Sequence, residues 1–132
     1  MPLPERTVNM KTVLLYNFSP ERLRQVKAAV MLVKAGARVV EKDSYGKKLG
    51  FLVGVKGYED TTEEAEDFND ELLVMSGFDS EDINRLITAL RRTGAGRIDL
   101  KAIITPTNMD WNSSQLYYAV RADHEEMHRS KS

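Results

Sequence analysis

A histidine pair near the end of the sequence has the spacing of a metal site. His124 and His128, with Glu125 directly after the first, match the pattern H-E-x-x-H. On a helix, two histidines at this spacing can bind one zinc ion, and the glutamate can act as a general base. A further ligand would have to follow His128, and the last turn of a terminal helix frays. We therefore assign no metal or catalytic residue and keep a metal-dependent hydrolase as an alternative function.

The acidic residues are concentrated in one segment. Between Glu59 and Glu71 there are eight acidic residues and no basic one, and the rest of the chain carries 19 basic and 12 acidic residues. The segment lacks the alternating ligands and the central glycine of an EF-hand calcium loop. Its composition is typical of a solvated, mobile linker, which we expect over residues 57–71. Folding of the segment over the basic remainder of the chain is the alternative.

Polar residues and one tryptophan follow the expected strands. The densest group is Thr105-Pro106-Thr107-Asn108 followed by Trp111. In a parallel sheet the strand ends meet at one edge, where helix N-termini favour anions. Turn and capping chemistry is the competing interpretation of the same residues. The residues that we predict to bind a ligand at this edge are Asn17, Asp79, Thr105, Thr107, Asn108 and Trp111.

Composition and the remaining motifs exclude several other classes. The chain of 132 residues has no cysteine, which excludes disulfides and thiolate catalysis and suits a reducing compartment. The glycines of the middle of the chain match neither the dinucleotide nor the Walker phosphate pattern; they are Gly46, Gly50, Gly54 and Gly57. Basic residues on the expected helices lack interleaved exposed aromatic residues, so we do not predict nucleic-acid binding. No apolar run is long enough to span a membrane, and we expect a cytoplasmic protein without a cofactor.

An internal repeat organises the elements that position these residues. Val13–Glu21 is similar to Leu73–Glu81 at an offset of 60 residues, and each stretch begins with a short apolar run. Such runs are typical of strands covered on both faces. Ser19 and Asp79 are suited to cap the helices that follow, and apolar residues then recur at helical spacing. We expect glycines to end these helices with positive φ angles, namely Gly36, Gly94 and Gly96.

The repeat predicts an α/β fold. Two βαβ units (residues 12–43 and 72–105) would form one mostly parallel four-stranded sheet, with helices packed on it and a C-terminal helix over 112–129. The middle segment, 44–56, favours a short helix, although its alternating apolar residues also allow a strand. If it is a loop or strand, a ferredoxin-like α+β arrangement is the alternative. We expect one domain over 12–129, preceded by a disordered arm over 1–11.

Three stretches of the sequence resemble a known family. They are Leu14–Phe18, Leu49-Gly50, and Lys101–Trp111 with Leu116-Tyr117 after it. Over most of residues 12–125 the chain resembles a family of small uncharacterised bacterial proteins, domain of unknown function 3783. The resemblance implies a bacterial cytoplasmic protein and supplies no activity or site residue.

The sequence thus favours a non-enzymatic binding or regulatory module. We expect it to bind a small anionic ligand or a protein partner at the edge defined above, and no membrane. Two alternatives remain open. One is the metal-dependent hydrolase that uses His124, Glu125 and His128. The other is a structural domain that forms a homodimer through apolar residues of its last helix.

Overall fold

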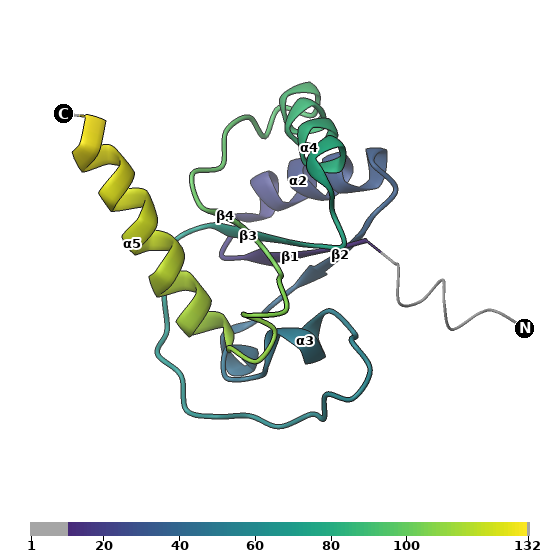
Figure 1. The fold of residues 1–132 in the computed structure, drawn as a ribbon. Helices are drawn as coiled ribbons and strands as arrows, with labels where there is room; N and C mark the ends of the chain where they lie inside the picture. The colour runs from purple at the N-terminus through teal and green to yellow at the C-terminus, as the bar shows by residue number, and fades with distance from the viewer. Residues whose placement is uncertain (1–10, 132) are drawn as a thin grey trace, which may run out of the picture.

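Two βαβ units and a long C-terminal helix make up the fold in the computed structural model (Figure 1). The structure describes the backbone of residues 11–131 and the side chains of residues 11–127, so the arm expected over 1–11 lies almost wholly outside the described residues. The elements, in chain order, are β1 (Thr12–Tyr16), α2 (Pro20–Leu32), β2 (Gly36–Val39), the 3-10 helix η1 (Lys42–Ser44), α3 (Leu49–Leu52), β3 (Leu72–Ser76), α4 (Ser80–Arg92), β4 (Lys101–Ile103) and α5 (Ser113–Lys131).

The four strands form one sheet in the order β2-β1-β3-β4. Each βαβ unit contributes a parallel pair, β1 with β2 and β3 with β4, whereas β1 and β3 are antiparallel, with Leu14 opposite Val74. The α/β fold with a mostly parallel four-stranded sheet is therefore confirmed. The ferredoxin-like alternative is wrong, because there the second strand of each βαβ unit does not pair with the first.

The antiparallel centre overturns one expectation about the strand ends. Because β1 and β3 run in opposite directions, the residues after β1 and those after β3 leave the sheet at opposite edges. The sequence pattern did not reveal this orientation, since a strand buried on both faces presents the same apolar run in either direction.

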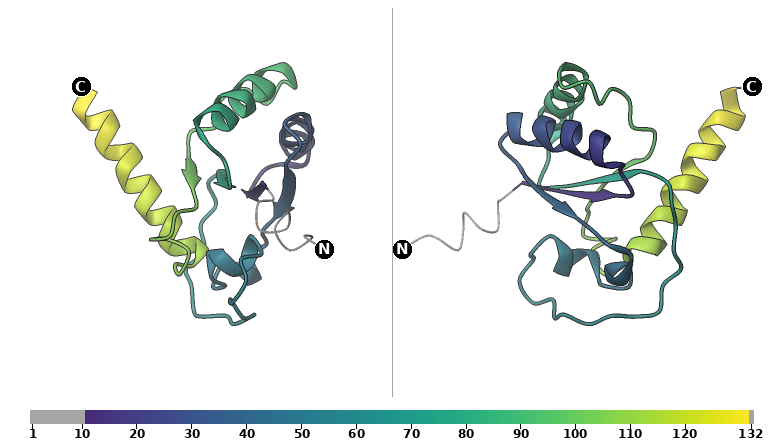
Figure 2. Two further views of the ribbon diagram at one scale, coloured as in Figure 1. Left: turned by 45° about the vertical axis from the view of Figure 1, so that its right-hand side comes forward. Right: turned by 180° about the vertical axis from the view of Figure 1, so that it is seen from behind.

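The sheet is covered on both faces (Figures 1 and 2). Alternate residues of a strand point to opposite faces, so Val13 and Leu15 pack under α2 and α4 while Leu14 and Tyr16 pack toward α3 and α5. Central strands covered in this way need an unbroken apolar run, which is the pattern that β1 and β3 carry.

Capping residues set the bounds of the two repeat helices. Ser19 Oγ accepts a hydrogen bond from the Arg22 backbone N–H at 3.4 Å, and Asp79 forms a capping box with Asp82. Gly94 and Gly96 have φ angles of 91° and 68° after α4, as expected. The prediction for Gly36 is wrong: Lys34 takes the positive φ of 62°, and Gly36 begins β2.

The middle segment and the acidic segment lie against the sheet rather than extending from it. The predicted short helix is present as α3. In the acidic segment, Phe68 is buried and its ring stacks between those of Tyr45 and Tyr117, with centroid distances of 4.4 Å and 4.1 Å. Lys47 binds Asp60 from the body of the domain. These contacts favour the alternative in which the segment folds over the basic remainder.

Candidate functional site

The structure does not gather the six predicted ligand residues at one place. Asn17 follows β1 and Asp79 follows β3. Because these two central strands are antiparallel, the two residues lie at opposite ends of the strands. Thr105 and Thr107 follow β4 and are exposed in the turn that leads away from it. Asn108 and Trp111 lie further along that connection, which returns beneath the sheet to α5.

Asn17 is engaged in holding the acidic segment. Its backbone has a φ of 66°, a conformation that asparagine tolerates better than most residues. Its Nδ2 donates to the carbonyl oxygens of Phe68 and Asp70, both at 3.0 Å, and its Oδ1 accepts from the Tyr45 hydroxyl at 3.2 Å. Its amide is thus committed to structure.

Asp79 and Asn108 are also committed to local hydrogen bonds. Asp79 Oδ1 accepts from the Asp82 backbone N–H at 2.8 Å. The Asn108 side chain is buried, with Oδ1 accepting from the Thr105 backbone N–H at 2.9 Å and Nδ2 donating to the Ile103 carbonyl at 3.0 Å. Ile103 belongs to the edge strand β4, whose outer carbonyl groups could accept hydrogen bonds from a further strand. The hydrogen bond from Asn108 takes up one of these carbonyl groups.

A hollow between α5 and β4 contains two of the predicted residues, Asn108 and Trp111. Its volume is about 390 Å³, within the range of small-ligand pockets. We call it the α5–β4 hollow. It is lined by Asp99, Lys101, Ala102, Asn108, Trp111, Leu116, Ala119, Val120, Asp123, His124 and Met127.

The hollow exists because only the first turns of α5 pack on the sheet. Leu116 and Tyr117 are buried in the core cluster beneath the sheet, whereas Met127 is 60% exposed. The later turns of α5 stand away from the strands in each view (Figures 1 and 2). Apolar residues that continue along α5 beyond its packed turns are therefore left facing the hollow.

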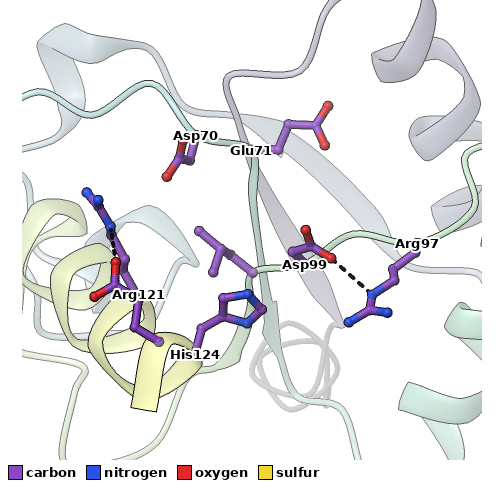
Figure 3. Close-up of a pocket in the computed structure, with 8 residues that line it drawn as sticks. Asp70, Glu71, Arg97, Asp99, Arg121 and His124 are labelled. Carbon is purple, nitrogen blue, oxygen red and sulfur yellow. Dashed lines mark hydrogen bonds and ion pairs between the residues drawn. The ribbon is translucent and has the colours of Figure 1, made fainter. Parts of the chain in front are cut away.

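A second, charged hollow adjoins the first and shares Asp99 and His124 with it (Figure 3). Its volume is about 380 Å³. Its lining residues are Asp70, Glu71, Arg97, Asp99, Leu100, Arg121, His124 and Glu125.

The charges of this second hollow are paired with one another or with their neighbours. Arg97 binds Asp99 at 3.0 Å, and Arg121 binds Glu125 at 3.0 Å. The Tyr117 hydroxyl donates to Asp70 at 2.6 Å. Burial raises the pKa of Tyr117, and this hydrogen bond to a carboxylate raises it further. Each of the acidic and basic side chains named here therefore has a partner within the folded protein.

The sequence patterns missed most of the lining of the α5–β4 hollow. The predicted ligand residues do not include Lys101, Ala119, Val120 and Asp123. Of these, Val120 lies at helical spacing from Leu116 and Met127, so the sequence does place it on an apolar stripe of the last helix. An apolar stripe that extends past the packed part of a helix was the available signal, but only the tertiary structure shows where the packing ends.

The histidine pair has no described metal site around it. Within residues 11–127 the structure contains no group of three or more His, Cys, Asp or Glu side chains placed to hold a metal ion. His124 lines both hollows, and the side chain of His128 lies outside the described residues. Over the same described part of the chain, no helix is long and apolar enough to cross a membrane.

Comparison with known proteins finds a match for part of the chain. A family model matches residues 71–127, the range that contains β3, α4, β4 and most of α5. Leu14–Phe18 and Leu49-Gly50, which also carried the resemblance, precede this range. Neither curated proteins nor solved structures give a match. The family whose model matches residues 71–127 is described as Domain of unknown function (DUF3783).

Proposed function

We propose that this protein is a non-enzymatic binding module that holds a small ligand with an apolar portion in the α5–β4 hollow. The observation that carries the proposal is the lining itself. Trp111, Leu116 and Val120 offer apolar surface, and Lys101 and Asp123 add charges of both signs to the lining. Small-molecule sites commonly combine apolar walls with polar groups that orient the ligand.

Binding is favoured over catalysis by the state of the acids and bases nearby. A catalytic carboxylate or hydroxyl must be able to reach a substrate atom. Here Asp70 accepts a hydrogen bond from the part-buried Tyr117 hydroxyl at 2.6 Å. Using either of these two groups in a reaction would first break this contact of the folded protein.

Trp111 provides a direct readout of occupancy. It is the only tryptophan in the chain and lies partly buried at the hollow. A ligand that enters the hollow changes the polarity around the indole ring, so we expect a saturable change in tryptophan fluorescence. The same ligand should raise the thermal unfolding midpoint, because a ligand at 100 times its Kd stabilises the folded state by about 2.7 kcal/mol. A metabolite panel screened by both readouts tests the proposal.

A matched pair of helix variants separates the hollow from the rest of α5. Ala119 lines the hollow and Ala122 is exposed on the same helix outside it. Ala119→Leu should fill the space and abolish both ligand signals, whereas Ala122→Leu should leave them unchanged. Equal binding by the two variants would place the ligand elsewhere.

Two other results would replace this proposal with one of its alternatives. If the panel gives no signal and light scattering finds a dimer that Met127→Glu dissociates, the exposed end of α5 is an interface between copies. If zinc is the one compound that stabilises the protein, and His124→Ala removes the effect, the histidine pair is a metal site after all.

A further inference from the structure

Three basic side chains converge on a small hollow on the α4 side of β4. Arg91 comes from the last turn of α4, Arg97 from the connection after it, and Lys101 from the start of β4. The hollow has a volume of about 160 Å³, and none of its lining residues is acidic. The apolar side chains of Ile87 and Leu90 form the rest of its wall together with the 96–98 segment. It is distinct from the α5–β4 hollow, which shares only Lys101 with it.

Lys101 is held there at an electrostatic cost. Its ammonium group donates a hydrogen bond to the Ile98 carbonyl. The pKa of Lys101 is lowered, first by burial and then by the positive charge of Arg97, and Asp99 opposes the shift. Two like charges near a partly desolvated position repel each other more strongly than they would in water. An anion between them would relieve this repulsion.

Arg91 and Arg97 are available to such an anion to different degrees. Within residues 11–127, whose side chains are described, Arg91 forms no ion pair or side-chain hydrogen bond. Arg97 is paired with Asp99, but its side chain is 77% exposed, and an exposed pair of this kind contributes little and exchanges readily. Asp99 is therefore an internal competitor for the anion rather than a permanent partner.

We propose that Arg91, Arg97 and Lys101 form a site for a phosphate-class anion, supplied by the phosphate group of a small phosphorylated molecule. Guanidinium groups match the oxygen geometry of phosphate, and a lysine ammonium adds a point charge. The volume admits a phosphate group but not the body of the molecule, which would extend outward along the exposed Arg91 and Arg97. This inference does not depend on the proposed function, because the two hollows have separate walls apart from Lys101.

Inorganic phosphate is the probe for the test. Titration calorimetry of the full chain at constant ionic strength, with chloride replaced by phosphate, should give one saturable site. Arg91→Ala should weaken phosphate binding by about tenfold or more, the usual effect of losing a charge-assisted hydrogen bond. Arg92→Ala is the matched control, because Arg92 is the next residue of α4, carries the same charge and lines a different hollow.

A second variant should strengthen phosphate binding, and such a gain cannot result from a failure to fold. Asp99→Asn frees Arg97 from its carboxylate, so it should tighten phosphate binding relative to the unaltered protein. Ala119→Leu should leave phosphate affinity unchanged, which separates this site from the α5–β4 hollow. Thermal unfolding without phosphate checks that each variant folds.

Three results would overturn the proposal. The first is the lack of saturable phosphate binding by the unaltered protein. The second is equal weakening by Arg91→Ala and Arg92→Ala, which indicates a general effect of net charge. The third is weaker binding by Asp99→Asn, which shows that the carboxylate supports the site rather than competing for it.

Discussion

The two faces of the sheet are covered by different means. On one face lie α2 and α4, each of 13 residues, and the cluster beneath them is almost entirely aliphatic. On the other face lie α3, the acidic segment and the first turns of α5. Their contact centres on four aromatic rings, which are Tyr16, Tyr45, Phe68 and Tyr117.

The difference shows what irregular covering segments require. A helix satisfies its own backbone, so α2 and α4 need only an apolar stripe toward the sheet. The acidic segment contains no helix or strand that would pair its backbone groups in this regular way. The Phe68 carbonyl instead accepts hydrogen bonds from Asn17 Nδ2 at 3.0 Å and Lys42 Nζ at 2.7 Å. On this face, hydrogen bonds from polar side chains therefore take the place of the backbone hydrogen bonds of a helix or strand. This role explains why a polar residue such as Asn17 looks like a ligand-binding residue in the sequence.

The largest expected effect tests whether the acidic segment is part of the core. Phe68→Ala should lower the free energy of unfolding by about 3–5 kcal/mol, because it removes a buried ring that stacks on two others. Urea unfolding measures the loss. Leu86→Ala on the α4 face is the comparison, with an expected loss of about 2–5 kcal/mol. If Phe68→Ala lowers the free energy of unfolding by less than about 1 kcal/mol, the acidic segment is a linker. It would then not be part of the core of its face, as α2 and α4 are of theirs.

The next effect tests the polar contacts of the aromatic face. The Tyr16 side chain is buried, and its hydroxyl lies 2.7 Å from Ser113 Oγ. Burial is also the main cause of the raised pKa of Tyr16. Ser113→Ala should cost about 1–3 kcal/mol, since the buried hydroxyl loses its partner. Adding Tyr16→Phe should recover part of this loss in urea unfolding. A double variant less stable than Ser113→Ala alone would contradict the explanation.

A smaller effect compares the two repeat helices at their N-termini. Asp79→Ala should cost about 1 kcal/mol, because it removes the reciprocal capping box of α4. Ser19→Ala should cost less, since the Ser19 cap of α2 is a single hydrogen bond of 3.4 Å. Thermal unfolding of the two variants measures the difference. A larger loss from Ser19→Ala would show that hydrogen-bond length does not rank the caps.

The smallest expected effect is one of pH. The pKa of Asp82 lies below its ordinary value of 3.8, mainly because Lys11 and the Asp79 backbone N–H bind the carboxylate. A lowered pKa in the folded state stabilises the fold above the unfolded-state pKa, and the contribution is lost as the pH falls toward the folded value. Asp82→Asn should therefore be less stable than the unaltered protein at neutral pH. The difference should shrink below about pH 4.

Urea unfolding of both proteins across that pH range measures this effect. We expect it to be small because asparagine keeps one side-chain oxygen as an acceptor, and Lys11 and Arg85 are 36% and 58% exposed and can return to solvent. A difference that stays constant with pH would assign the effect to packing instead of charge.

Hydrogen bonding explains why the structure does not bring the predicted ligand residues together. Asn17, Asp79 and Asn108 were selected as polar residues at strand ends, and all three turn out to hold backbone groups. Short polar side chains serve turns, caps and ligands with the same atoms, so residue type does not distinguish these uses. Trp111 was selected by the same reasoning and lines the α5–β4 hollow, where its large apolar ring has no competing role in a turn.

The sequence by itself determined the local elements, because their causes are local. The 60-residue repeat defines two βαβ units, apolar spacing defines α2 and α4, and Ser19 and Asp79 define where these helices begin. Only the tertiary structure decided the antiparallel pairing of β1 with β3, since both orientations bury the same side chains. It also decided where α5 leaves the sheet, because that depends on how far the rest of the chain extends beneath it. Both hollows beside α5 follow from that second decision.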